Sequence, residues 1–421
     1  MIDFSTFTLD NGLKVLVNED PDTSLVAVNL LYRVGARNED PDRTGFAHLF
    51  EHLMFGGSRH IPEFDRPLQL AGGENNAFTN NDLTNYYITI PKENVETAFW
   101  LESDRMLEPA FSEEGLQVQK QVVIEEFKQR YLNQPYGDVW LLLRPLAYKK
   151  HPYRWPTIGR EISHIEKATL EEVKAFFFSH YAPNNAILSL SGNISSGEAE
   201  ELVRKWFGDI PGRQLAGEKI PAEPPHGKKE VLHVERDVPA DVIYMAWHMD
   251  PRYSEGFYAS DLITDILANG NSSRLYQRLV KERRLFSQID AYVMGSIDPG
   301  LLIISGTLMN RVTMEDAEES ILDELQLLIK GDLEERELTK VKNRVESTWV
   351  FSQAHILNKA MNLAYFEFLD HAGAVNSEMD RYRGVTTGMI RAKAKELFRE
   401  NNLSVLYYHA AARNDEQGNT Q

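Results

Sequence analysis

One stretch near the middle of the sequence separates the chain into two parts. Residues 211–230, PGRQLAGEKIPAEPPHGKKE, are rich in proline, glycine and charge and poor in aromatic side chains, which is typical of a linker. A chain of 421 residues is also too long for one ordinary hydrophobic core. We therefore predict a first domain over residues 1–211, a linker over 212–231, a second domain over 232–410 and a disordered tail over 411–421.

Each part begins with strand periodicity and continues with helices. FTLDNGLKVLVNED alternates around Asn11-Gly12, a pair suited to the positive φ angles of a type I′ turn, and predicts a hairpin. TSLVAVNLLYRVGARNED predicts a long, largely buried strand, and helical spacing follows from Gly45 to about Phe55. The second part restarts with a strand at DVIYMAWHM and a helix at GFYASDLITDILANG.

The two parts also resemble each other locally. AHLFEHLMFGGS and SDLITDILANGN keep their apolar positions in register, which favours an internal duplication. A chance likeness between two amphipathic helices is the alternative. We predict an α+β fold of two tandem homologous α/β-sandwich domains, each a sheet packed with helices.

Composition excludes several classes of protein. The chain has 63 Asp and Glu against 45 Lys and Arg, a formal net charge of -18, which argues against nucleic acid as a partner. Because it has no cysteine, disulfides and thiolate metal sites are excluded. No apolar run approaches the length of a membrane span, and MIDFSTFTLDNG lacks the features of a signal peptide. We expect no membrane contact and a cytoplasmic protein, or a periplasmic one if a leader has been removed.

The apolar segment GFAHLFEHLMFGG carries three polar side chains whose burial is costly unless they are paired. On a helix, positions i, i+3 and i+4 share a face, so His48 and His52 lie one turn apart with Glu51 beside them. Two imidazoles at this spacing can hold one tetrahedral zinc ion, with the carboxylate as a base. His-x-x-Glu-His is the inverted form of the zincin signature. The alternative is a buried histidine pair bonded to backbone carbonyls, with Glu51 capping or ion-paired.

A catalytic zinc site needs a third protein ligand, and VQKQVVIEEFKQR offers two adjacent carboxylates on one predicted helix. Val122 and Val123 precede Glu126 by four and three positions. Glu126 therefore continues the apolar face, while Glu125 points about 100° away. We predict Glu126 as the ligand, with Glu125 as the fallback. The alternative is that both belong to an ordinary solvated helix face.

Several segments in the same order resemble the pitrilysin or insulinase family of zinc metallopeptidases, in particular its half-length members of the mitochondrial processing peptidase type. They are TGFAHLFEHLMFGGS, GGENNAFTNNDLTNYYITIP, KQVVIEEFKQR, HPYRWPTIG, HYAPNNAILSLSGNI and GNSSRLYQRLVKERRLF. The resemblance implies half of a clamshell, with a zinc-binding catalytic first domain and an inactive repeat as the second. It also implies one zinc ion per chain, held by His48, His52 and Glu126, with Glu51 as the general base.

The resemblance assigns further positions and shows two departures. Asn76 and Ala77 match the edge strand to which the substrate backbone adds. Many relatives have a second Glu seven residues before the ligand Glu; here it is Gln119, which can hydrogen-bond behind the ligands but adds no charge. Active single-chain relatives usually carry an Arg and, seven residues on, a Tyr that engage the substrate or the oxyanion. Val280 and Ser287 occupy those places. The alternative is that zinc and a differently placed arginine suffice.

These features lead to one expected function and two alternatives. We expect a zinc-dependent endopeptidase that hydrolyses extended peptides or unfolded segments in a chamber formed with a second chain. That partner is a second copy or a related subunit that supplies the missing Arg and Tyr. The alternatives are a noncatalytic core or assembly subunit, and a peptide-binding module that uses the edge strand without turnover.

Overall fold

The computed structural model describes residues 1–215, 217, 219–331 and 333–411. Residues 412–421 of the predicted tail lie outside this part. The chain forms two compact units, each assembled from three stretches of sequence. Unit 1 contains residues 1–129, 150–222 and 345–380, and unit 2 contains 130–149, 223–344 and the described residues from 381 on.

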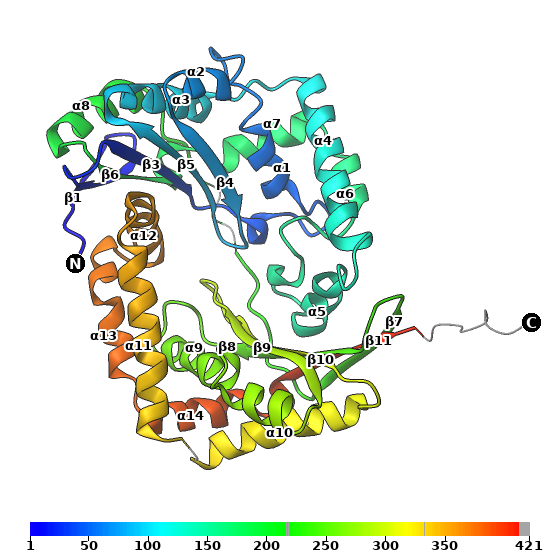
Figure 1. The fold of residues 1–421 in the computed structure, drawn as a ribbon. Coiled ribbons are helices and arrows are strands. Elements are labelled where there is room, and N and C mark those ends of the chain that lie inside the picture. The colour runs from blue at the N-terminus through cyan, green and yellow to red at the C-terminus, as the bar shows by residue number, and fades with distance from the viewer. Residues whose placement is uncertain (216, 218, 332, 412–421) are drawn as a thin grey trace, which may run out of the picture. The chain divides into compact units, whose positions relative to one another are not determined.

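Unit 1 is built on a mixed sheet with strand order β1-β2-β6-β3-β5-β4. The strands are β1 Ser5–Thr8, β2 Lys14–Glu19, β3 Leu25–Tyr32, β4 Glu74–Thr79, β5 Thr84–Pro91 and β6 Ala186–Gly192. Its helices are α1 Phe46–Leu53, α2 Asp65–Leu70, α3 Val95–Leu107, α4 Glu113–Phe127, α6 Ile162–Glu166, α7 Leu170–His180, α8 Ser196–Phe207 and α12 Ile356–Leu369. Helix α12 packs on β6, β3 and β2, whereas α3 and α8 cover the other face (Figure 1).

The position of each strand in this sheet follows from its burial pattern. In β3, every residue except Leu25 is buried, as expected for a central strand covered on both faces. In β4, exposed and half-buried residues alternate, which is typical of a strand with one wet face. Strand β4 lies at the end of the sheet, so its outer edge carries backbone groups that the sheet does not pair.

The predicted N-terminal hairpin is present, but its turn differs from the prediction. Strands β1 and β2 pair antiparallel, with Ser5 opposite Val17 and Thr8 opposite Lys14. Gly12 has φ 89°, whereas Asn11 is not among the residues with positive φ, so the type I′ prediction is wrong. The Asn11 side chain instead donates to the carbonyls of Phe207 and Ile210, both at 2.8 Å. These contacts with the end of α8 account for the different turn.

Unit 2 repeats the arrangement of unit 1. Its strands are β7 Glu230–Arg236, β8 Val242–Met249, β9 Phe286–Met294, β10 Gly300–Leu308 and β11 Leu403–Ala410. Their order, β7-β11-β8-β10-β9, places the first, last, second, fourth and third strands side by side, as in β2-β6-β3-β5-β4. In these two five-strand series the pairs β2-β6 and β7-β11 are parallel and the others are antiparallel. The predicted duplication is confirmed.

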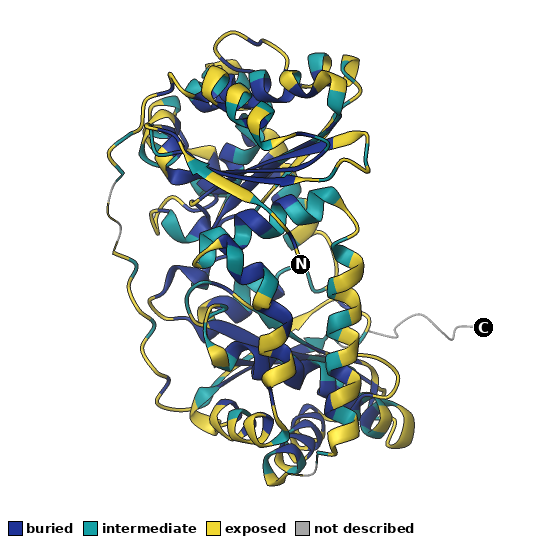
Figure 2. Cartoon of the chain, turned by 90° about the vertical axis from the view of Figure 1, so that its left-hand side faces the viewer, coloured by how far each residue is buried: buried dark blue, intermediate teal, exposed yellow. Residues whose placement is uncertain are grey.

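Helices cover the second sheet as well, and its central strands are largely buried (Figure 2). The helices of this unit are α5 Val139–Ala147, α9 Glu255–Ala268, α10 Met314–Lys330 and α14 Thr387–Leu397. Two more helices, α11 Glu335–Ser352 and α13 Glu378–Gly384, begin in one unit and end in the other. None of the helices in the described residues is both long and apolar enough for a membrane span.

The two halves of the sequence exchange one helix each. Helix α5, from the first half, packs on β11, β8 and β7 of unit 2, and α12, from the second half, packs on the first sheet. The predicted linear division into residues 1–211 and 232–410 does not include this exchange. The reason is physical: an amphipathic helix must cover its apolar face, but its sequence does not say which sheet provides the cover.

Candidate metal centre

Helix α1 places two histidines side by side because its other face is anchored in the core. Leu49 and Phe50 are buried, and the Phe50 ring lies 4.3 Å from that of Tyr181, centroid to centroid. The helix begins after Gly45, which has φ 90°, a left-handed conformation that favours glycine. His48 and His52 therefore project together from the opposite, half-buried face.

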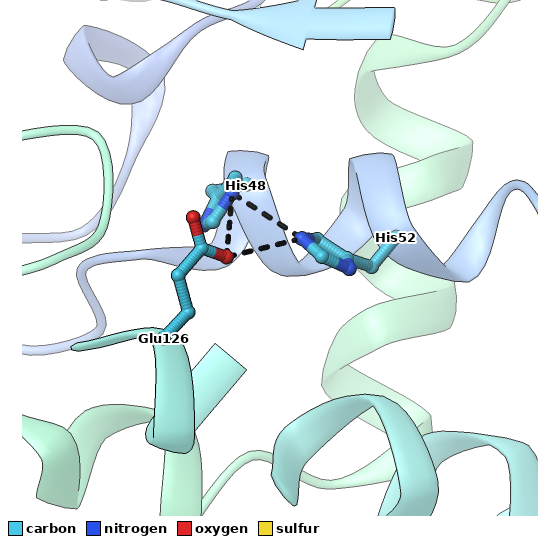
Figure 3. A group of neighbouring side chains, drawn as sticks. All are labelled: His48, His52 and Glu126. Atoms are coloured by element: carbon cyan, nitrogen blue, oxygen red, sulfur yellow. Dashed lines mark hydrogen bonds and ion pairs between the residues drawn. The ribbon is translucent and has the colours of Figure 1, made fainter. Parts of the chain in front are cut away.

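The structure brings His48, His52 and Glu126 into one triangle (Figure 3). The Nε2 atoms of the two histidines lie 3.3 Å apart. Oε2 of Glu126 lies 3.6 Å from His48 Nε2 and 3.5 Å from His52 Nε2. Among the described residues, no other group of three such ligand atoms lies this close together.

The size and chemistry of the triangle fit a divalent metal ion. Ligands about 2.0–2.1 Å from a tetrahedral zinc ion are separated by about 3.3–3.4 Å, close to the three distances in the structure. Two imidazoles and a carboxylate also form a known three-ligand set of catalytic zinc sites, which keeps a fourth position open. The side chains are 15–25% exposed, so the site is partly screened from water yet reachable.

The neighbouring carboxylate, Glu125, lies elsewhere. It is exposed and pairs with Lys128 at 2.7 Å, so the structure favours Glu126 over the fallback. The reasoning that selected Glu126 was half right. Val123 is fully buried, as expected, but Val122 is 43% exposed, so the inward face of α4 is centred on the Val123 side.

Glu51 lies beside the triangle and is hydrogen-bonded to a residue of strand β4. Its Oε2 atom accepts a hydrogen bond from the Thr79 hydroxyl at 2.5 Å. Burial raises the pKa of Glu51 above the usual value, while the Thr79 hydrogen bond and nearby His52 lower it. A carboxylate that is next to a metal position, and not part of it, can act as a proton acceptor.

A network that sequence reasoning missed holds the first turn of α1. The buried Glu39 side chain accepts hydrogen bonds from the amides of Gly45 at 2.9 Å and Ala47 at 2.8 Å. Burial raises the pKa of Glu39 to about 8. The Thr44 amide donates to Nδ1 of His164 at 3.1 Å. Neither Glu39 nor His164 has a ligand spacing or periodicity that could have revealed this role.

The predicted substrate-binding residues lie on the edge strand. Asn76 and Ala77 are consecutive residues of β4, and α1 packs against this strand. The Ala77 amide donates to the Asn76 side-chain oxygen at 2.8 Å, so this amide is directed away from β5. An antiparallel ladder alternates paired and outward-facing residues; Ala77 is one of the outward-facing ones.

Gln119 lies on α4, seven residues before Glu126. In the described part of the chain it makes no hydrogen bond to His48, His52 or Glu126. It lines a cavity of about 240 Å³. The walls of this cavity are mostly apolar and include Leu53, Phe111, Leu116, Leu170 and Val173. The structure thus places Gln119 at a neighbouring apolar cavity.

In unit 2, the positions expected to carry an Arg and a Tyr, and the position aligned with His48, hold other residues. Val280 lies in a π-helical segment, Tyr276–Glu282, and Ser287 is an exposed residue of β9 whose hydroxyl donates to the Thr307 carbonyl at 3.3 Å. Arg278 pairs with Glu324 at 2.9 Å. Asp261, which aligns with His48, accepts a hydrogen bond from Tyr382 at 2.6 Å. These side chains form no metal-ligating group in the described residues.

Two family models match successive parts of the chain. Residues 14–159 match the family described as Insulinase (Peptidase family M16), and residues 167–345 match the Peptidase M16 inactive domain. The zinc protease PqqE of Helicobacter pylori is 32% identical over 344 residues, which cover 80% of this chain and 77% of that protein. The uncharacterized zinc protease YmxG of Bacillus subtilis is 26% identical over 403 residues, 94% of this chain and 96% of that one.

Solved structures show the same fold. The crystal structure of a protease from Helicobacter pylori matches with a TM-score of 0.90 at 26% identity, covering 97% of this chain and all of that one. Pitrilysin matches with a TM-score of 0.78 at 18% identity, covering 97% of this chain but only 45% of its own. With a relative 32% identical over most of its length, and family matches over residues 14–159 and 167–345, the chain belongs to the M16, or insulinase, family of peptidases.

Proposed function

We propose that the protein is a zinc-dependent endopeptidase that hydrolyses extended peptides or unfolded segments of polypeptide. The observation that carries the proposal is the triangle of His48, His52 and Glu126 with Glu51 beside it, since this set provides three ligands and a separate base. The names of the relatives, zinc proteases, support zinc as the metal. We expect one ion per chain.

The chemistry divides between the metal and Glu51. A zinc ion held by the three ligands would supply Lewis acidity, which polarises the scissile carbonyl and makes water a stronger acid. Glu51 accepts a proton from the attacking water and passes it to the nitrogen of the leaving amine. Water adds across the peptide bond, and the products are a carboxylic acid and an amine. Helix α1 orients both groups because His48, Glu51 and His52 share one rigid element.

The free edge of β4 suits an extended substrate. Outward-facing backbone groups at Ala77 can pair with the backbone of any peptide, independent of its side chains. We infer that Asn76 turns its side-chain oxygen away from the Ala77 amide when a substrate strand pairs there. This mode of binding favours flexible chains, because most segments of a folded protein already pair their backbone groups and must be released first.

We further propose that a second chain completes the chamber. Val280 and Ser287 stand where an Arg and a Tyr are expected, so this chain lacks that pair. Pitrilysin and the periplasmic protease PqqL of Escherichia coli are about twice as long as the region that matches, which supports two such halves per working enzyme. The partner is a second copy or a related subunit. We place the enzyme in the cytoplasm, or in the periplasm if a leader is removed.

The same departure leaves two alternatives. If no partner supplies the Arg and Tyr, the chain is a noncatalytic core subunit or a peptide-binding module. Zinc analysis and a quenched-peptide assay separate these functions. We expect the purified protein to contain zinc and to cleave peptides, and a chelator to stop cleavage. We expect Glu51→Gln to retain zinc and lose hydrolysis, and His48→Ala to lose both. Equal turnover by Glu51→Gln and wild type would refute the proposed mechanism.

A further inference from the structure

The carboxylate of Glu51 depends on a single side chain for its hydrogen bonding. Within the described residues, the Thr79 hydroxyl is its only hydrogen-bond partner, at 2.5 Å from Oε2. Thr79 lies 28 residues further along the chain, at the end of β4, whereas Glu51 lies on α1. The contact therefore joins the helix that carries the base to the strand at the sheet edge.

The direction of this hydrogen bond is determined by the next residue in the network. Thr84 pairs with Thr79 across β4 and β5, and their hydroxyl oxygens are 3.4 Å apart. The fully buried Thr84 donates its single proton to the carbonyl of Val34 at 2.9 Å. Thr84 can then only accept from Thr79. The Thr79 proton is directed to the much closer oxygen of Glu51.

The backbone of Thr79 faces the free edge. The Ala77 amide points outward, and the Asn80 amide bonds to the Leu83 carbonyl of the neighbouring strand. In an antiparallel ladder this alternation places Thr79, like Ala77, among the outward-facing residues. One residue thus offers its backbone to an added peptide strand and its side chain to Glu51.

We propose that Thr79 is a positioning residue that couples strand binding at β4 to the orientation of Glu51. The inference rests on the proposed function, in which Glu51 is the base and β4 binds the substrate backbone. A peptide strand paired with Ala77 and Thr79 restrains the end of β4. The Thr79 hydroxyl then holds one Glu51 oxygen and leaves the other for the proton of water. Loss of this hydroxyl lowers kcat and leaves KM and zinc binding unchanged.

The test compares two substitutions that separate the hydroxyl of Thr79 from its methyl group. Thr79→Val keeps the shape and removes the hydroxyl, whereas Thr79→Ser keeps the hydroxyl and removes the methyl group. Thr89→Val, on β5, is the matched control, because Thr89 has no side-chain hydrogen bond to the site. For each full-length variant, zinc content, kcat, KM and the unfolding midpoint are measured. If Thr79→Val does not fold, Thr79→Ala replaces it.

The expected result is specific. In Thr79→Val, kcat falls by about 10- to 100-fold, the usual effect of removing a partner that orients a functional group. KM stays within about twofold, zinc content is unchanged, and Thr79→Ser restores most of kcat. An unchanged kcat in Thr79→Val, or an equal loss in Thr79→Ser, overturns the inference while the proposed function stands. Absence of turnover in the wild type overturns both.

Discussion

The first turn of α1 depends on one carboxyl group from the preceding loop, and Glu39→Ala tests that dependence. Glu39 accepts hydrogen bonds from the amides of Gly45 and Ala47, both of which belong to buried residues. Amides at the start of a helix have no partner within the helix, and Gly45 has no side chain to cap them. Glu39 therefore supplies the cap from outside.

The magnitude follows from these contacts. Glu39→Ala leaves two buried amides without an acceptor, at about 1–3 kcal/mol each. Part of this cost is offset, because the variant no longer buries a carboxyl group whose pKa burial raises to about 8. We expect the free energy of unfolding to fall by roughly 2–4 kcal/mol. Since His48 and His52 move with α1, zinc affinity should fall about tenfold or more, at 1.4 kcal/mol per factor of ten.

Urea unfolding of the metal-free protein and zinc titration with a competing chelator measure both effects. Glu63→Ala is the control, because Glu63 is exposed and surface substitutions usually change stability by less than about 0.5 kcal/mol. A loss in Glu39→Ala no larger than in Glu63→Ala would refute the capping argument. Normal stability with weakened zinc binding would show that Glu39 acts on the ligands alone.

Three further outcomes are expected. Glu126→Gln should lose most of its zinc and Glu125→Gln should keep it, as measured by metal analysis; the reverse would make Glu125 the ligand. The raised pKa of Glu39 means that the folded chain binds more protons than the unfolded chain between about pH 5 and 8, so stability should fall as pH rises through this range. In Glu39→Gln, the free energy of unfolding, measured with urea at several pH values, should fall less steeply as pH rises. Arg105 forms a bidentate pair with Glu102, at 2.5 and 2.7 Å, in the core. Arg105→Leu should therefore lower the free energy of unfolding by about 3–5 kcal/mol, because it leaves a buried carboxylate without its partner. A loss below about 1 kcal/mol in thermal unfolding would contradict this.

The parts of the site that lie on one helix could be predicted from sequence. His48, Glu51 and His52 share a face because of the helical repeat alone, and Glu126 follows from its spacing to the buried Val123. The duplication was equally accessible, because it repeats an apolar pattern. Local periodicity carries this information, and no knowledge of distant contacts is needed.

The supporting contacts could not be predicted in this way. Glu39 reaches α1 from a preceding loop and Thr79 reaches Glu51 from a strand, and a single polar residue leaves no periodic signal. The predicted turn type at Asn11 was wrong because the Asn11 side chain donates hydrogen bonds to residues almost 200 positions away. The exchange of α5 and α12 was missed because the sequence of an apolar helix face does not indicate which sheet the helix will pack against.

The place of α12 affects how the protein can be made. This helix, near the end of the chain, packs against Leu16, Leu31 and Ile187 of the first sheet through residues such as Leu363 and Phe366. Most of the protein has been synthesised before α12 leaves the ribosome. During synthesis, this face of the first sheet therefore stays uncovered until α12 can pack on it. A fragment truncated at the linker keeps all the proposed zinc ligands but exposes this apolar surface, and should aggregate rather than yield a minimal enzyme.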